Sequence, residues 1–396
     1  MRTQRQLFFD HLALPSVFPM ELEIDHAKGI YMYSPDGKKY IDLVSGVCVS
    51  NLGHGHPAII EAVKTQVDKY MHLMVYGEFI QSPQVMLARE LTELLPDKLN
   101  SVYFVNSGSE AVDGALKLAK RFTSRTELVG FKNAYHGGTH GAFSMLGNED
   151  IKYAYRPLLP DTRFLSFNNF DDLEQITERT ACVLVEPVQA EAGIIVPEND
   201  FLKALRKKCN ETGAMLIFDE IQVGFGRTGK LFCFEHYDVV PDILCLAKGM
   251  GAGMPIGAFV ADKKMMLTFT KNPDFGHITT FGGHPVSAAA ALANLEVLSD
   301  KKSPVAEVEE KGRLYEESLR DHPKVVKIRR KGLLMSVELE SLEINNNAMK
   351  ALLEHGLVTD PFFFMPQAFR IAPPLTITKE EVLMTIDLVN KSLDSL

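Results

Sequence analysis

Two segments of this sequence end on charged side chains that are suited to chemistry. The apolar segment MLIFDE ends on Asp219 and Glu220, and the apolar segment ILCLAK ends on Lys248, just before a glycine-rich turn. Buried strands do not need such charged residues for packing. At the carboxyl edge of an open parallel sheet, where α/β enzymes bind their ligands, the carboxylate and the lysine would meet.

The pair of Asp219 and Lys248 has a chemical interpretation. A lysine can form a Schiff base with an aldehyde cofactor, and pyridoxal phosphate also needs an anionic partner for its ring nitrogen. A buried carboxylate would keep that nitrogen protonated, so that the ring can accept electron density from a carbanion. Alternatively, Asp219 caps a turn and Lys248 lies on the surface; these two residues alone leave both interpretations open.

An anion site is predicted at the start of a helix. The strand expected at 101–105 is followed by Ser107, Gly108 and Ser109, which open a helix with an apolar face. Backbone N–H groups at a helix N-terminus bind anions, and serine hydroxyls add donors, so a phosphate would fit here. The same serines could instead act only as N-caps. Tyr135, at the exit of the next strand, could cover a flat ring.

Two other kinds of motif are weak. Gly224, Gly226 and Gly229 match the dinucleotide pattern G-x-G-x-x-G, and with Lys230 they give most of a P-loop. Leu231 stands where a P-loop has Ser or Thr, and no clear helix follows, so we do not expect a nucleotide site. The histidines of NLGHGHP and AYHGGTH lie in glycine-containing loops without a further ligand cluster, so we expect no metal site.

The elements that must position these residues follow an alternating pattern. From about residue 100, short apolar runs alternate with stretches of helical spacing, which predicts a mostly parallel sheet with helices on both faces. The expected strands are 101–105, 127–131, 162–167, 181–187, 215–220, 242–247 and 256–261.

The two ends of the chain are expected to form a smaller α+β domain. A hairpin is predicted over 29–44 around a Pro-Asp-Gly turn, and residues 1–28 are expected to be irregular. Helices are expected to begin at Pro57, after Pro285 and at Thr378. The expected domains are an N-terminal part of the small domain (1–50), a large cofactor-binding domain (51–285) and a C-terminal part of the small domain (286–396).

Composition and charge limit the possible functions. The 396 residues are 46% hydrophobic and 23% charged, which is typical of a globular protein with room for two domains. The net charge of −9 argues against nucleic-acid or anionic-membrane partners. We expect neither a secretory signal nor a membrane span. The five cysteines are scattered and odd in number, which favours reduced thiols and a cytoplasmic location.

Together these motifs resemble the class III pyridoxal-phosphate aminotransferases of fold type I. The resemblance spans nearly the whole chain and includes NSGSEA, AYHG, EPVQAEAG, FDEIQVGFGRTGK, LAKGMGAGMPIGA and TTFGGHP. Within the class, the length and the LAKGMGAGMPIGA stretch are most similar to the acetylornithine and ornithine subgroup. The resemblance implies a seven-stranded, mostly parallel sheet flanked by helices, pyridoxal 5'-phosphate as cofactor, and a homodimer with active sites at its interface.

The resemblance also implies roles for individual residues. Lys248 would form the Schiff base and shuttle protons, and Asp219 would hold the pyridine nitrogen. Arg370 would clamp a substrate carboxylate through a two-pronged hydrogen bond, and Glu191 would pair with Arg370 when the bound donor has no carboxylate nearby. The other implied cofactor contacts are Ser107, Gly108 and Ser109 at the phosphate, Ile221 and Tyr135 on the two ring faces, Gln222 at the ring hydroxyl, and Thr280 at the phosphate of the neighbouring subunit.

Four positions depart from the pattern of the subgroup. Gly138 stands where ornithine-type members usually have an arginine, so one carboxylate-binding group is missing. Val47 occupies a pocket-lining position where an aromatic residue would favour free ornithine. His284 replaces an asparagine, and Ala190 replaces a glycine. Acetylornithine and ornithine are therefore kept as candidate substrates beside other ω-amines and amino acids.

The activity implied by the resemblance is transamination. An amino acid or an ω-amine would donate its amino group, and a 2-oxo acid such as 2-oxoglutarate would accept it. The alternative is an aminomutase or a racemase on the same fold, which would need no second substrate.

Overall fold

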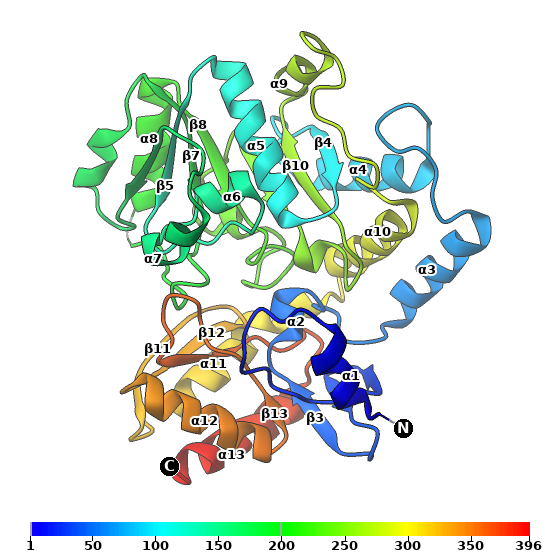
Figure 1. Cartoon of the computed structure of the whole chain (residues 1–396), viewed down its shortest axis with the longest axis vertical. Helices are drawn as coiled ribbons and strands as arrows, with labels where there is room; N and C mark the ends of the chain where they lie inside the picture. The colour runs from blue at the N-terminus through cyan, green and yellow to red at the C-terminus, as the bar shows by residue number, and fades with distance from the viewer. Residues whose placement is uncertain (1, 199) are drawn as a thin grey trace.

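The large part of the molecule is built on one seven-stranded sheet (Figure 1). The computed structural model describes residues 2–198 and 200–396. The strand order is β4-β10-β9-β8-β7-β5-β6; β10 runs antiparallel to both of its neighbours, β4 and β9, and the other neighbouring pairs are parallel. The strands are β4 (Ser101–Val105), β5 (Glu127–Phe131), β6 (Thr162–Leu165), β7 (Thr180–Val185), β8 (Met215–Asp219), β9 (Ile243–Leu246) and β10 (Gly257–Ala261). The mostly parallel sheet expected from the sequence is confirmed.

Both faces of this sheet are buried. Because successive side chains of a strand point to opposite faces, Leu216 and Phe218 of β8 join one core cluster, whereas Ile217 joins another. Helix α8 (Phe201–Thr212) belongs to the first cluster, and α5 (Gly108–Thr123) belongs to the second. The apolar side chains of β8 therefore pack in two cores, and the polar residue at its end, Asp219, lies at the carboxyl edge of the sheet.

Two further helices begin at prolines. Pro57 opens α3, and Pro285 opens α10, where the missing N–H group of proline costs no helical hydrogen bond. No described helix combines the length and apolarity needed to cross a bilayer. The helices are α3 (Pro57–Lys69), α4 (Ser82–Leu94), α6 (His140–Ser144), α7 (Glu149–Lys152), α9 (Lys263–Met266) and α10 (Pro285–Ser299). Short 3-10 turns lie at 153–155, 171–175, 233–236, 248–250, 267–270 and 304–307.

The smaller part contains both termini (Figure 1). Strand β3 pairs with β2 in the expected hairpin and, in parallel, with β13 from near the C-terminus. The expected α+β domain made from both ends of the chain is therefore present. Its strands are β1 (His26–Lys28), β2 (Tyr31–Tyr33), β3 (Lys39–Asp42) and β13 (Leu357–Val358) in one sheet, and β11 (Val325–Lys331), β12 (Leu334–Leu339) and β14 (Ala368–Ile371) in another. Its helices include α11 (Val308–Leu319), α12 (Leu342–Glu354) and α13 (Lys379–Asp394).

The expectation that residues 1–28 are irregular was wrong at 26–28, where β1 lies, and at 4–11. Helix α1 (Gln4–His11) begins there with a capping box: the Thr3 hydroxyl accepts from the Gln6 amide at 3.2 Å, and the Gln6 side chain accepts from the Thr3 amide at 2.9 Å. The Thr-x-x-Gln spacing that is typical of a capping box is visible in the sequence. A second short helix, α2 (Ser45–Cys48), includes Val47 in the left-handed region at φ 61.

Candidate active site

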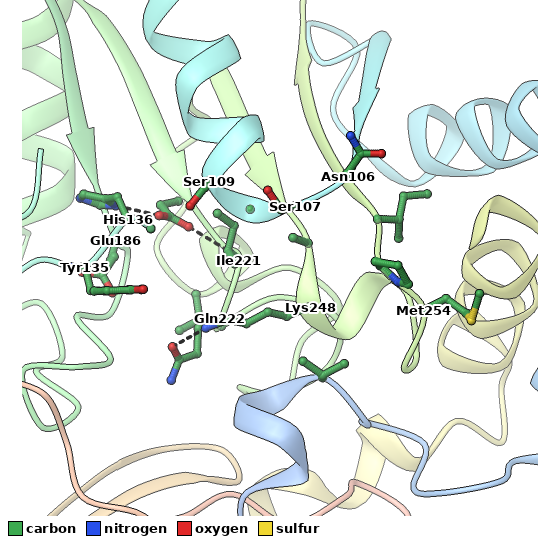
Figure 2. A pocket seen from close by; sticks show the side chains of 18 of the residues that line it. Asn106, Ser107, Ser109, Tyr135, His136, Glu186, Ile221, Gln222, Lys248 and Met254 are labelled. Atoms are coloured by element: carbon green, nitrogen blue, oxygen red, sulfur yellow. Dashed lines mark hydrogen bonds and ion pairs between the residues drawn. The ribbon is translucent and has the colours of Figure 1, made fainter. Parts of the chain in front are cut away.

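Asp219 and Lys248 line the same cavity at the carboxyl edge of the sheet. Strands β8 and β9 are parallel neighbours that align Asp219 with Cys245, and Lys248 follows the end of β9. Lys248 itself has φ 47, a backbone conformation that non-glycine residues rarely adopt and that clusters at functional sites. The cavity has a volume of about 380 Å³ and also includes the start of α5 (Figure 2).

The Asp219 carboxylate is held by two hydrogen bonds. Its Oδ2 lies 2.7 Å from Nδ1 of the buried His136, and its Oδ1 accepts from the Ile221 amide at 3.0 Å. In the described chain, His136 Nε2 has no hydrogen-bond partner. Sequence reasoning considered His136 only as a metal ligand and missed this contact, although its place beside Tyr135 was an available signal.

A second buried acid, Glu186, lies in the same cavity and was also missed. Its carboxyl group accepts from the backbone amides of Tyr135 at 3.3 Å and Ala190 at 3.2 Å. Burial, followed by the charge of Asp219, raises the pKa of Glu186 well above its usual value. The surroundings of Glu186 therefore favour its uncharged form beside Asp219.

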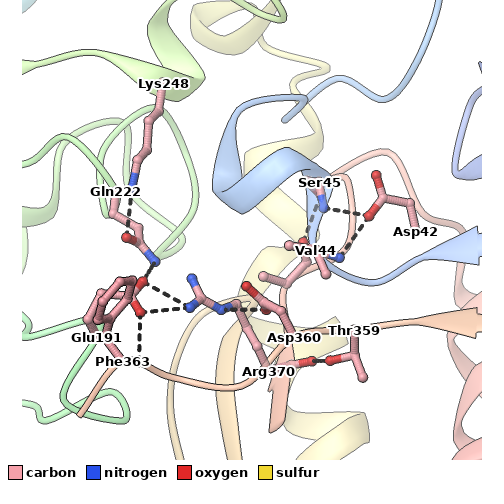
Figure 3. Close-up of polar contacts among 11 residues, drawn as sticks. Asp42, Val44, Ser45, Glu191, Gln222, Lys248, Thr359, Asp360, Phe363 and Arg370 are labelled. Atoms are coloured by element: carbon pink, nitrogen blue, oxygen red, sulfur yellow. Dashed lines mark hydrogen bonds and ion pairs between the residues drawn. The ribbon is translucent and has the colours of Figure 1, made fainter. Parts of the chain in front are cut away.

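A chain of hydrogen bonds runs from Lys248 to Arg370 (Figure 3). The Lys248 amine donates to Gln222 Oε1 at 2.8 Å, and Gln222 Nε2 donates to Glu191 Oε1 at 3.2 Å. Arg370 Nη2 donates to Glu191 Oε1 at 2.9 Å and to Glu191 Oε2 at 3.1 Å. These hydrogen bonds connect four residues that lie far apart in the sequence.

The start of α5 combines an N-cap with an open set of amides. The Ser107 hydroxyl accepts from the Glu110 amide at 3.2 Å, so the expected cap is present. The amides of Gly108 and Ser109 belong to the first turn, whose N–H groups lack helical partners. A Cβ at Gly108 would lie 2.9 Å from Ile221 side-chain carbons, so a larger residue would crowd this edge of the cavity. An anion could therefore bind to the amides of this turn, in addition to the N-cap contact that Ser107 makes.

Tyr135 and Ile221 are two further walls of the cavity. Tyr135 also stacks on Phe363, with ring centroids 5.4 Å apart and ring planes at 26°. Tyr135, like Lys248, also lines a second cavity. Burial, with a smaller contribution from Glu191, raises the pKa of Tyr135, so its hydroxyl stays protonated at neutral pH.

The second cavity has a volume of about 610 Å³ and is lined by charged and aromatic side chains. Arg370 Nε lies 3.1 Å from Asp360 Oδ1, on the other side of the guanidinium from Glu191 (Figure 3). Burial opposes ionisation of Glu191, but the charges of Arg370 and Lys248 outweigh it and lower the pKa of that carboxyl. Val47 also lines this cavity. Asp360 and Phe363 were missed, because no spacing in the sequence links them to Arg370.

Thr280 is the one expected site residue that lies outside both cavities. It is exposed, in a segment that Asn106 tethers by donating to Thr279 Oγ1 at 2.8 Å. Of the positions that depart from the subgroup, His284 precedes α10 and stacks on His72, with ring centroids 5.5 Å apart. A Cβ added at Gly138 would meet no atom within 4 Å, so the missing side chain leaves open space.

The glycines of the G-x-G-x-x-G match have structural roles. Gly226 and Gly229 have φ of 87° and 90°, which other residues rarely adopt. A Cβ at Gly226 would lie 2.6 Å from Val305 Cγ2, so this turn packs closely against the smaller part of the molecule. The segment that follows forms only the 3-10 turn at 233–236, not the long helix that a dinucleotide fingerprint requires.

The fold and the site together define a pyridoxal-phosphate enzyme of fold type I. The chain belongs to the class III aminotransferase family: the family model described as Aminotransferase class-III matches residues 14–393. The activity is therefore pyridoxal-phosphate-dependent transamination, and the comparisons do not favour the alternative of an aminomutase or a racemase.

Curated relatives and solved structures agree with this assignment. The chain is 39% identical to an acetylornithine aminotransferase of Methanopyrus kandleri over 376 residues, which cover 94% of each chain. It is 37% identical to an acetylornithine aminotransferase of Methanocaldococcus jannaschii, over 94% of this chain and 93% of the relative. An ornithine aminotransferase from Toxoplasma gondii, solved with pyridoxal phosphate at partial occupancy, matches with a TM-score of 0.91 and 29% identity, over 99% of this chain and 94% of its own. A transaminase from the marine bacterium Virgibacillus matches with a TM-score of 0.92 and 26% identity, over 100% of this chain and 99% of its own.

Proposed function

We propose that Lys248 and Asp219 perform the transamination, with an amino acid or an ω-amine as donor and a 2-oxo acid, such as 2-oxoglutarate, as acceptor. The observation that carries this proposal is their position: both reach one 380 Å³ cavity from the ends of neighbouring parallel strands. Substrate and cofactor groups held in such a cavity are oriented by rigid elements rather than by mobile loops.

The residues around the cavity fit pyridoxal phosphate. The amides of Gly108 and Ser109, with the adjacent Ser107, would hold the phosphate at the start of α5. When bound, the cofactor supplies an aldehyde carbon that amines attack and a ring that accepts electron density. Ile221 and Tyr135 would cover the two ring faces.

Asp219 would keep a proton on the ring nitrogen. Its carboxylate is already oriented by His136 and by the Ile221 amide, so little rearrangement is required. Glu186 lies beside it, and burial together with the charge of Asp219 raises the pKa of Glu186, which favours its uncharged form. Gln222 would contact the ring hydroxyl, and it already holds Lys248 Nζ at 2.8 Å.

Lys248 Nζ would move the proton during the reaction. With the cofactor and a donor bound, the free Lys248 amine would be the base that takes the proton from the donor carbon and the acid that returns it. With a 2-oxo acid, the same group would act in the opposite direction. The position of Lys248 in the cavity, beside Asp219 and Gln222, supports this role.

Arg370 and Glu191 would adapt the site to two kinds of substrate. When a carboxylate substrate is bound, Arg370 would clamp its carboxylate through two parallel hydrogen bonds. When a donor without a nearby carboxylate is bound, Glu191 would hold Arg370, and the observed pairing at 2.9 Å supports that arrangement. Acetylornithine and ornithine, named for the relatives, remain candidate donors, and Gly138 removes one group that would bind their carboxylates.

We also propose a homodimer in which Thr280 reaches the phosphate of the neighbouring subunit. Large apolar side chains close to Thr280 in the sequence are exposed in the single chain, including Ile278 (51%) and Phe281 (53%), which supports a covered surface. The proposed domain limits are 51–285 for the large domain and 1–50 with 286–396 for the small domain, supported by the separate sheets. The five buried, free cysteines support the proposed cytoplasmic location.

The visible absorption spectrum tests the proposed function. The protein is mixed with pyridoxal phosphate, excess cofactor is removed, and donors are added one at a time, followed by 2-oxoglutarate. A cofactor band that a donor bleaches and 2-oxoglutarate restores supports the two half-reactions. Repeated turnover of a donor without any acceptor, beyond one equivalent per active site, would contradict transamination and favour the aminomutase or racemase alternative.

A further inference from the structure

The guanidinium of Arg370 lies between two carboxylates (Figure 3). Glu191 binds Nη2 at 2.9 and 3.1 Å, and Asp360 Oδ1 lies 3.1 Å from Nε. The Arg370 side chain is 1% exposed, so water screens these charges weakly. One positive charge therefore faces two acids in a buried site.

The charges that line the 610 Å³ cavity do not balance once the cofactor is considered. They come from Lys248, Arg370, Glu191 and Asp360. In the proposed function Lys248 would hold the cofactor, at the end of the cavity where the donor reacts. Away from Lys248, the guanidinium of Arg370 faces the carboxylates of Glu191 and Asp360, so the charged residues there have a local excess of negative charge.

Asp360 also retains unused hydrogen-bonding capacity. Its contact with Arg370 has ion-pair distance but not hydrogen-bond geometry, because Asp360 Oδ1, Arg370 Nε and Arg370 Nη1 all lack hydrogen-bond partners in the described part of the chain. The Asp360 side chain is 29% exposed, whereas Arg370 is fully covered. Asp360 Oδ1 is itself buried, so a ligand in the cavity would reach the carboxylate through Oδ2.

The aromatic side chains of the same cavity also suit a cation. Tyr135 and Phe363 stack on one another, and Phe363 remains 58% exposed. The Arg370 guanidinium lies over the Phe362 ring, 4.7 Å from the ring centroid. Aromatic faces attract ammonium groups and offer nothing comparable to a carboxylate.

We propose that Asp360 is a specificity-determining residue that directs this site toward amino donors with a second cationic group at their far end, such as α,ω-diamines. The reacting amine would lie at the cofactor near Lys248, and the distal ammonium would lie between Asp360 and the Tyr135–Phe363 pair. This inference rests on the proposed function of the site. It remains compatible with a 2-oxo acid acceptor, since Asp360 contacts Nε and leaves both Nη groups for a carboxylate once Glu191 withdraws.

The test compares three donors of equal chain length in the holoenzyme: 1,5-diaminopentane, pentylamine and 5-aminopentanoate. The rate of cofactor bleaching per unit of donor concentration is measured for the wild type and for Asp360→Asn. We expect the wild type to prefer the diamine, and we expect the substitution to lower the ratio of diamine to pentylamine rates by about tenfold or more, as for the loss of a hydrogen bond to a charged group. The rate with 5-aminopentanoate should rise relative to that with pentylamine.

Asp387→Asn is the matched control, because it removes the same charge from an exposed position on α13. It should leave all three ratios unchanged. A second measurement avoids chemistry altogether: calorimetry gives the Kd of pentyltrimethylammonium and of hexanoate, neither of which can react. The wild type should bind the cation more tightly than the carboxylate, and Asp360→Asn should weaken cation binding by about tenfold.

The outcomes separate this inference from the proposed function. Equal changes with all three donors, or a wild-type enzyme that binds hexanoate as tightly as the cation, would overturn the role of Asp360 and leave the catalytic proposal standing. A protein that gives no cofactor band would contradict the proposed function itself. If Asp360→Asn does not fold, the preference of the wild type between the two non-reacting probes still decides the question.

Discussion

His136 Nδ1 lies 2.7 Å from Asp219 Oδ2, and both side chains are buried at the carboxyl edge of the sheet. The contact fixes the carboxylate that is proposed to hold the ring nitrogen of the cofactor. Because the Ile221 amide binds the other oxygen at 3.0 Å, Asp219 is oriented from two directions. The first prediction concerns this pair.

Asp219→Asn should lower kcat by about 10²–10³-fold, as does the loss of a preorganised group that stabilises charge in a transition state. His136→Asn should have a smaller effect, about tenfold, because Asp219 would remain but would be held less firmly. Steady-state rates are measured together with cofactor content, so that a loss of binding is not mistaken for a loss of chemistry. Near-normal turnover of a fully loaded Asp219→Asn enzyme would contradict its role.

Gly138→Arg should shift the donor preference toward substrates with a carboxylate distant from the reacting amine. The added Cβ has open space within 4 Å, and the Gly138 amide can keep its hydrogen bond to Ser109 Oγ at 2.9 Å. A charge-assisted pair between the new arginine and the donor carboxylate should raise kcat/KM for N-acetylornithine by about tenfold or more. Gly138→Ala, which adds a methyl group without charge, is the control. If the Arg and Ala variants have the same preference, the missing arginine does not limit the substrates.

Glu220 should make the folded state less stable as the pH rises. Burial raises its pKa to about 8, although the amides of Cys233 and Phe234, each at 2.6 Å, partly oppose the shift. Because the folded state favours the protonated acid, its stabilising contribution is complete below the unfolded pKa of about 4.5 and is lost as the pH rises toward 8.

Glu220→Gln cannot titrate, so its Tm should fall less steeply between pH 5 and pH 8 than that of the wild type. The slope is the informative quantity, because the amide also changes hydrogen bonds at every pH. Glu186, whose pKa is also raised, should leave part of the slope in place. Parallel curves for the two proteins would show that Glu220 does not titrate in this range.

Asp360 should make the binding of cations depend on pH. Burial raises its pKa to about 6, Arg370 and Lys248 oppose the shift, and Glu191 and Asp42 add to it. Asp360 is therefore protonated at pH 5 and ionised at pH 7, so the affinity for pentyltrimethylammonium should increase between these values and level off above them. Ionisation of Glu191 does not cause this increase in affinity, because the pKa of Glu191 is lowered. The same titration of Asp360→Asn should be flat, and a step that persists in that variant would assign the dependence to another group.

Much of the fold and part of the site could be predicted from the sequence, for physical reasons. A strand buried on both faces has a continuous apolar run, so a charged residue at its end is visible, as at Asp219 and Lys248. His136 could not be placed in this way, because it lies in a loop whose path depends on tertiary packing. Glu186 directly follows the apolar run of β7, so its position carried the same kind of signal as that of Asp219. Asp360 meets Arg370 only because β14 follows a turn that brings them within 3.1 Å. Helix α1, in contrast, had a readable Thr-x-x-Gln signal that was overlooked.

The assignment of Lys248 is tested most directly by locating the covalent bond between the protein and its cofactor. The holoenzyme is reduced with borohydride, which makes a lysine–pyridoxal linkage permanent, and is then digested and examined by mass spectrometry. The proposed function predicts one modified peptide, with the added mass on Lys248, and no modification in Lys248→Ala, which should also lack turnover. A modified lysine elsewhere, or a Lys248→Ala enzyme that keeps substantial turnover, would contradict it.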